Sequence, residues 1–103
     1  MTVVEILKAA KEKLTEPRVW VNHTPAGEDN CECIVTACAN VDTAGYNWDD
    51  AANILDLLAR RQGFKSETGI YRPAAQWNDA PNRTIEEVLA LFDQAILLAE
   101  SAP

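Results

Sequence analysis

The sequence predicts a mainly α-helical fold: a compact four-helix domain with long ordered loops and at most one small two-stranded β-ribbon. Two observations lead to this prediction. Four segments begin with a residue typical of a helix N-cap, and each continues with apolar residues three or four positions apart, the spacing of one helical face. The chain has 103 residues, 48% hydrophobic and 24% charged. This size and composition are typical of one soluble domain, so residues 1–103 are expected to fold as a single domain.

The first and last helices have the same type of start signal. A Thr followed three residues later by a Glu is the pattern of a capping box, and it occurs at Thr2–Glu5 and at Thr84–Glu87. We therefore expect one helix over about 3–15, closed by Pro17, and another that starts at Thr84. The apolar band of this last helix exceeds half of its circumference, so the helix is either central or offers one edge to a partner.

The two middle helices also begin with capping signals: Asp29–Glu32 repeats the capping-box pattern, with Asp29 as the cap and Glu32 reaching back, and Asn47 is a single cap. Asp29 precedes an apolar stripe that runs from Cys31 to Val41, which predicts a helix of about three turns with Cys31 in its first turn. Asn47 precedes the next stripe, which starts at Trp48 and stops before Gly63, the residue expected just after a helix C-terminus.

Two segments have no clear helical period. Residues 18–23 favour β structure and could pair with residues 68–72 as a small ribbon, or they form an extended connection. Residues 64–83 read as an ordered loop with a short helical turn at Pro73–Trp77, because a connection this long is uncommon without structure of its own.

The formal net charge of −7 is concentrated in the middle of the chain, since residues 19–59 contain seven acidic residues and no Lys or Arg. Such a charge disfavours direct binding to nucleic acid or to an anionic membrane. It suits a protein partner with a basic surface, or it serves only solubility. We expect one negative face there, with Glu28, Asp42, Asp49 and Asp56 exposed.

The three cysteines predict a reducing, cytoplasmic setting, because an odd number cannot all pair within one chain and the sequence shows no export signal. Together with His23 they have the chemistry of a zinc site, but Cys31 and Cys33 would lie about 200° apart on a helix. We therefore expect no metal, and the four isolated glycines argue against a nucleotide cofactor. A small thiol-dependent or ligand-binding enzyme is the alternative function, with Cys31 as nucleophile and His23 as base.

Three stretches carry a family resemblance: Cys31–Val41, Gln76–Thr84 and Glu86–Phe92. They resemble a family of small proteins found in actinobacteria and in the phages that infect them. The Trp-Asn-Asp-x-Pro-x-Arg-Thr run is the specific part, and the resemblance covers residues 31–41 and 76–99. Ile34–Thr36 depart from the pattern, where members have smaller residues. The family has no established activity, so the resemblance implies a source rather than a mechanism.

This source favours a non-enzymatic accessory protein that binds another protein in the cytoplasm, which would be the host cytoplasm for a phage product. The sequence also allows a homo-oligomer. The candidate binding residues, chosen for hydrogen-bonding and hot-spot chemistry or for charge, are Trp77, Asn78, Asp79, Arg83, Glu28 and Asp49.

A structural interpretation competes for the Trp77–Arg83 segment. In this interpretation Trp77 pins the 64–83 loop to the core against the last helix, and Asn78 and Asp79 bond backbone amides of the turn before Pro81. Arg83 then pairs with Asp79 across the same turn. The structural interpretation is favoured over the binding one.

Overall fold

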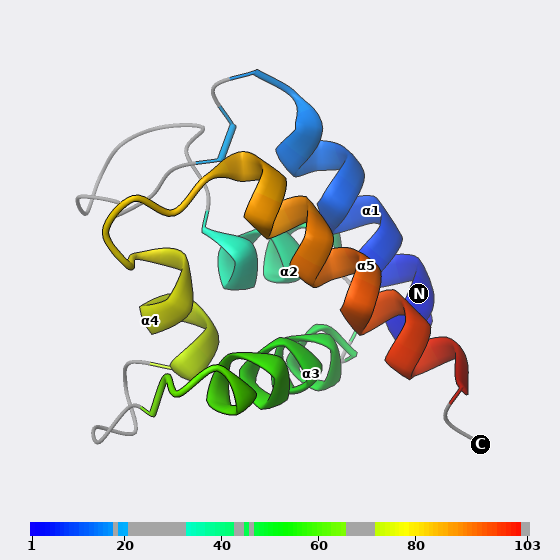
Figure 1. Cartoon of the computed structure of the whole chain (residues 1–103). Coiled ribbons are helices and arrows are strands. Elements are labelled where there is room, and N and C mark those ends of the chain that lie inside the picture. Colours follow the sequence, from blue (N-terminus) through cyan, green and yellow to red (C-terminus); the bar gives the residue numbers. More distant parts are fainter. Residues whose placement is uncertain (18, 21–32, 43–44, 46, 66–71, 102–103) are drawn as a thin grey trace.

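Five helices make up the described part of the computed structural model, which covers residues 1–17, 19–20, 33–42, 45, 47–65 and 72–101. In chain order they are α1 (Val3–Thr15), α2 (Ile34–Val41), α3 (Trp48–Arg61), α4 (Pro73–Asn78) and α5 (Ile85–Ser101) (Figure 1). The mainly helical prediction is confirmed. The fifth helix is α4, which the sequence predicted only as a turn within a loop.

The predicted β-ribbon is not supported. The described residues contain no strand, and most of the two segments expected to pair, 18–23 and 68–72, lies outside them.

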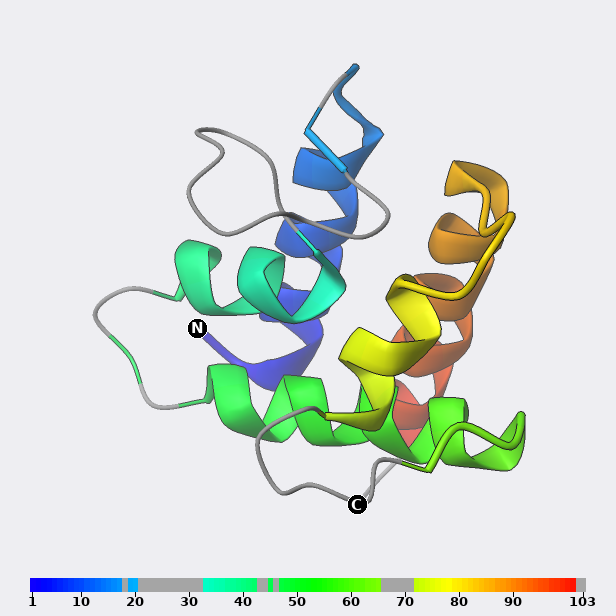
Figure 2. The same cartoon turned by 90° about the vertical axis from the view of Figure 1, so that its left-hand side faces the viewer.

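Three long helices frame the core. Helices α1 and α5 lie side by side and run in opposite directions, and α3 crosses beneath them (Figures 1 and 2). Helix α2 packs against α1 and α3, and α4 packs against α3 and α2. The radius of gyration is 12.5 Å, close to the value of about 13 Å expected for a folded chain of this length. The largest fully buried apolar side chains come from all five helices: Ile6, Leu7, Leu14, Ile34, Leu55, Trp77, Val88, Leu91 and Phe92.

The capping boxes predicted at Thr2–Glu5 and Thr84–Glu87 are confirmed, and the one predicted at Asp29–Glu32 lies outside the described residues. The Thr2 backbone N–H donates to Glu5 Oε1 at 2.8 Å, and the Glu5 N–H donates to Thr2 Oγ1 at 3.2 Å. At α5 the Thr84 N–H donates to Glu87 Oε1 at 3.0 Å, and the Glu87 N–H donates to Thr84 Oγ1 at 3.2 Å. The hydrogen bond from the threonine N–H lowers the pKa of each glutamate, because it stabilises the ionised carboxylate.

The predicted end of α3 is also confirmed. Gly63 has a φ of +94°, the left-handed conformation that glycine adopts without strain. Its N–H donates to the Arg60 carbonyl at 3.0 Å, and the Phe64 N–H donates to the Ala59 carbonyl at 3.1 Å. These two bonds form a Schellman motif, which satisfies carbonyls that a helix end leaves open.

The starts of α2 and α3 differ from the prediction. The N-cap of α2 is Cys33, in an extended conformation, and its Sγ accepts the Thr36 N–H at 3.4 Å. The described helix therefore begins about one turn later than predicted, with Cys33 rather than Asp29 as its N-cap. Asp29 and Cys31 themselves lie outside the described residues.

Asn47 is the N-cap of α3 by position, but its side chain makes no capping bond. Instead, Asp42 Oδ2 accepts the N–H groups of Asn47 and Trp48, both at 3.0 Å. A carboxylate at this end is also favoured by the helix dipole. The cap of α3 is thus supplied by the residue that ends α2.

Candidate functional site

The Trp77–Arg83 segment, one of the two places predicted to bind a partner, is largely built into the core. Trp77 is 1% exposed and Asn78 is fully buried. The Trp77 indole N–H donates to Gln62 Oε1 at 2.9 Å, and Asn78 Oδ1 accepts the Trp20 indole N–H at 2.7 Å. The hydrogen bond of Trp77 therefore goes to the end of α3 and not to the last helix. Neither of the two buried side chains is open to a partner in this conformation.

Arg83 covers the indole of Trp77. Its guanidinium lies 3.8 Å from the Trp77 ring centroid and 5.6 Å from that of Phe64. Its Nε donates to the Trp77 carbonyl at 2.9 Å, and its Nη1 pairs with Glu87 at 2.8 Å. The predicted pair with Asp79 is therefore wrong. Glu87 lies in the first turn of α5 and Arg83 lies in the connection before it, so the pair holds this connection to the start of α5.

Asp79 is the C-cap of α4, where its backbone N–H donates to the Ala75 carbonyl at 3.0 Å. Its carboxylate accepts the Asn78 Nδ2 group at 3.0 Å. The side chains of the segment thus hold α4 against the core and turn the chain into α5.

Two of the four acidic residues expected to be exposed on a negative face are buried. Asp42 is 4% exposed and Asp56 is 5% exposed, so the expectation that both are exposed is wrong. Each is buried because it accepts backbone N–H groups at a helix start, Asp42 at α3 and Asp56 at Ala74 of α4 (2.9 Å). Glu28 lies outside the described residues. Docking of a basic partner on this window stays a prediction, and Asp49 is the only one of the four residues that is both described and exposed.

Asp49 is exposed, as predicted, but it is already paired. It belongs to a row on α3, with Asn53 and Asp56, that surrounds the guanidinium of Arg72 at distances of 2.8, 2.6 and 2.9 Å. Burial by itself lowers the pKa of Arg72, but the hydrogen bonds to Asp49 and Asp56 outweigh it and raise the pKa. The row fixes the residue before α4, so its first role is structural.

The thiol site cannot be assembled from the described residues, because Cys31 and His23 both lie outside them. The thiol enzyme therefore stays a prediction. Of the described cysteines, Cys33 is half-buried and Cys38 is buried. Burial raises the pKa of Cys38 to about 12. Cys38 is therefore protonated at neutral pH and is not a nucleophile there.

Two further features, a metal site and a membrane-spanning helix, are absent from the described part of the chain. No three His, Cys, Asp or Glu side chains in it come together as a metal site. Nor does any helix there have the length and apolar character needed to cross a bilayer.

The seam between α1 and α5 carries a groove that the sequence did not predict. The groove has a volume of about 460 Å³. Its walls combine four residues of α1 with two of α5: Lys8, Lys11, Glu12, Thr15, Asp93 and Ile96. Lys11 Nζ and Asp93 Oδ1 bridge the two helices at 2.6 Å. A smaller hollow of about 190 Å³ continues the seam beyond Thr15, between the end of α1 and the start of α5.

An exposed leucine stands next to this groove. Leu97 does not line the groove, but it lies one turn after the groove residue Asp93 on α5 and is 68% exposed. The sequence contained a signal for it, because the apolar band of α5 is wider than one contact face. The buried side of α5 is formed by Val88, Leu91, Phe92 and Ala95, and Leu97 points away from this side.

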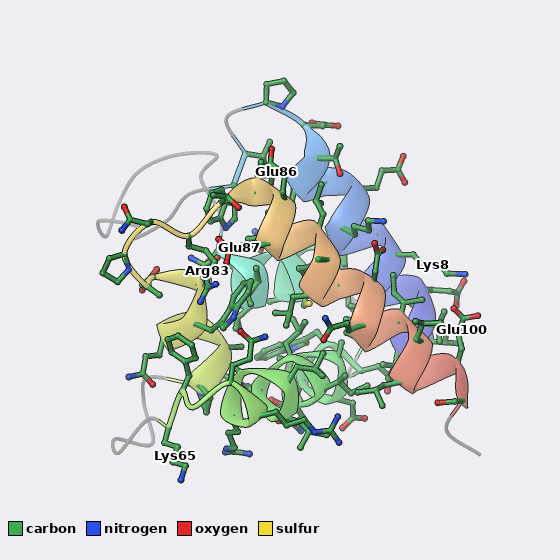
Figure 3. The ribbon with its side chains drawn as sticks, viewed as in Figure 1. Lys8, Lys65, Arg83, Glu86, Glu87 and Glu100 are labelled. Atoms are coloured by element: carbon green, nitrogen blue, oxygen red, sulfur yellow. The ribbon has the colours of Figure 1, made fainter. Side chains whose placement is uncertain are left out.

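The outward side of α5 forms a narrow row, which we name the outer stripe. Its residues are all exposed, and they are Glu86, Ala90, Asp93, Leu97 and Glu100. Figure 3 shows Glu86 near the start of the helix and Glu100 near its end, where Lys8 of α1 also lies.

Comparison with known proteins places the chain in a family. No curated protein and no solved structure matches it significantly. The sequence of residues 1–98 matches a family of unknown function, DUF6197. This match covers nearly the whole chain, including all five helix starts. The protein therefore belongs to the DUF6197 family.

Proposed function

We propose that this protein is a non-enzymatic module that acts by binding another protein through the surface formed by α1 and α5. The observation that carries the proposal is the exposed Leu97 beside a groove of about 460 Å³. A single exposed leucine is common on protein surfaces, but one that borders a groove can be buried by a partner that fills the groove. Burying a leucine side chain contributes about 1.5–3 kcal/mol, so this contact alone can distinguish partners.

The charges around the groove favour a specific fit over a purely apolar contact. Four charged residues, Lys8, Lys11, Glu12 and Asp93, line the groove together with Ile96, so a partner would meet an apolar side chain among charges. An apolar centre with a charged rim is the usual arrangement of a protein interface. The rim gives such a partner its orientation on the surface.

We also propose an organism of origin and a cellular location for the protein. The resemblance of the Trp77–Thr84 run to proteins of actinobacteria and their phages supports an accessory protein of such an organism. The odd number of cysteines supports a protein that acts in a reducing cytoplasm. For a phage product this is the cytoplasm of the host.

The test compares Leu97→Asn with a matched control, Leu57→Asn. Leu57 is 42% exposed on α3, so the control removes an exposed leucine from a different helix. The wild-type protein and both variants are immobilised, and proteins of an actinobacterial lysate are captured and identified. A captured protein is then purified, and its affinity for each form is measured by calorimetry.

The proposal predicts that the Leu57→Asn form binds like the wild type and that Leu97→Asn binds about tenfold more weakly, the loss expected for about 1.4 kcal/mol of apolar contact. Equal affinity for all three forms would refute binding at this surface. Circular dichroism checks that both variants are folded.

A further inference from the structure

We infer that the partner presents a basic amphipathic helix, which lies along the outer stripe of α5. This inference rests on the proposed function, and it names the chemistry of the partner at that surface. Three features of the stripe point to such a partner: its spacing, its charges without ion-pair partners among the described residues, and the position of Leu97.

The stripe has the spacing of a helix-packing seam. Glu86, Asp93 and Glu100 follow one another at intervals of seven residues. Seven residues make two helical turns less about 20°, so the three side chains lie on one side of α5. Glu86 and Glu100 are about 21 Å apart along the axis, at a rise of about 1.5 Å per residue. A partner helix of about four turns would span both carboxylates.

The two ends of the stripe carry carboxylates that form no ion pair within the described part of the chain, although Lys8 lies at the Glu100 end (Figure 3). Among the described residues, neither Glu86 nor Glu100 has an ion-pair partner, whereas the central Asp93 is paired with Lys11 at 2.6 Å. The unpaired negative charge therefore stands at the two ends, and it suits Lys or Arg at matching positions of the partner.

The apolar residues of the stripe determine which positions of the partner helix should be apolar. Leu97, at 68% exposure, lies one turn before Glu100, and Ala90 leaves room for a larger side chain one turn after Glu86. A partner with a large apolar residue near each basic residue would bury Leu97 and fill the space over Ala90. Basic residues beside an apolar stripe are the pattern of a basic amphipathic helix.

A second copy of this chain fits the stripe less well. Two stripes facing each other would bring Glu86 and Glu100 of each copy close to carboxylates of the other, and like charges repel at such a contact. The stripe therefore favours a basic partner over self-association.

The test uses a fluorescent synthetic helical peptide of about 20 residues, with leucines on one face and lysines beside them. Its affinity is measured by anisotropy for the wild type, for Glu86→Lys, for Glu100→Lys and for Asp50→Lys. Asp50 is an exposed acidic residue of α3 outside the stripe. The third variant changes the net charge as much as the others, so it controls for general attraction between a basic peptide and an acidic protein.

The inference predicts that both stripe variants bind the peptide about tenfold more weakly and that Asp50→Lys binds less than about twofold more weakly, as expected when local attraction becomes repulsion. Equal losses in all three variants would overturn it, because binding would then follow net charge alone. A loss in only one stripe variant would overturn the spanning geometry. An otherwise identical peptide with glutamates in place of lysines must not bind; its binding would overturn the basic partner.

These failures are separate from a failure of the proposed function. The comparison of Leu97→Asn with Leu57→Asn tests the surface with whatever protein it captures, regardless of charge. If that comparison succeeds while the peptide test fails, α1 and α5 form the binding surface for a partner of different chemistry.

Discussion

Replacement of Trp77 by alanine tests how the segment before α5 is held. The indole is 1% exposed, donates to Gln62 at 2.9 Å, and lies under the Arg83 guanidinium at 3.8 Å. Trp77→Ala removes all three contacts at once and leaves a cavity between α3 and α4. It also leaves Arg83, whose side chain is only 10% exposed, without the ring that it covers.

The expected loss of stability is the sum of three contributions. Truncation of a buried tryptophan costs about 3–5 kcal/mol, including the cavity. The cation–π contact adds about 0.5–2 kcal/mol, because Arg83 is partly shielded from water. The Gln62 hydrogen bond adds about 0.5 kcal/mol, at the low end, since Gln62 is exposed and can bond water instead. The sum of about 4–7.5 kcal/mol is comparable to the whole stability of a domain at the lower end of the usual range of about 5–15 kcal/mol.

Urea unfolding, followed by far-ultraviolet circular dichroism, measures this loss. Trp77→Ala should be unfolded or nearly so without urea, and Gln62→Ala, which removes only the hydrogen bond, should lose about 0.5–1 kcal/mol. A double-mutant cycle of Trp77→Leu with Arg83→Gln should give a coupling of at least about 0.5 kcal/mol. The reasoning is refuted if Trp77→Ala folds with a loss below about 1 kcal/mol, because the indole then contributes little to the core.

Two further predictions concern the loop before α3 and the buried thiol. A methyl group at Gly45 would overlap the carboxylate of Asp42, so Gly45→Ala should lose about 1–3 kcal/mol in urea unfolding; a neutral effect would show that the cap of α3 tolerates displacement. The pKa of Cys38 is raised from 9.0 to about 12, so the unfolded chain ionises first and the free energy of unfolding should fall as the pH rises from about 9 to about 12. Cys38→Ala should remove this part of the pH slope, and an unchanged slope would contradict the assignment.

Sequence reasoning predicted the parts of the fold that local chemistry decides. The capping boxes at Thr2 and Thr84 need only residues three positions apart, and Gly63 needs only its own freedom of φ. In each case the partner lies within one turn. The local sequence pattern is therefore nearly sufficient to predict these helix ends.

The errors fall where the partner is more distant. Asp56 reads as an exposed acidic residue of an amphipathic helix, but it is buried because Arg72 and Ala74, 16 and 18 residues later, bind its two oxygens. Asp42 reads as a residue past the end of a helix, but it caps the helix that starts at Trp48. No local pattern identifies these partners. The count of charges along the sequence therefore placed the carboxylates of Asp42 and Asp56 on the surface, where they do not lie.

The same distinction explains why α5 is the better candidate for a binding surface. A buried polar group must find a partner, so the folded chain uses the charges of Asp42, Asp56 and Arg83 to hold its loops and helix ends. An exposed apolar side chain has no such requirement within the chain, and Leu97 is not needed for the packing of α5, whose buried side already contacts α1 and α3. In the proposed function, a partner covers this side chain, which lies between two carboxylates without ion-pair partners in the described structure. Substitution of Leu97 should therefore change binding with little change in stability, the opposite of what is expected for Trp77.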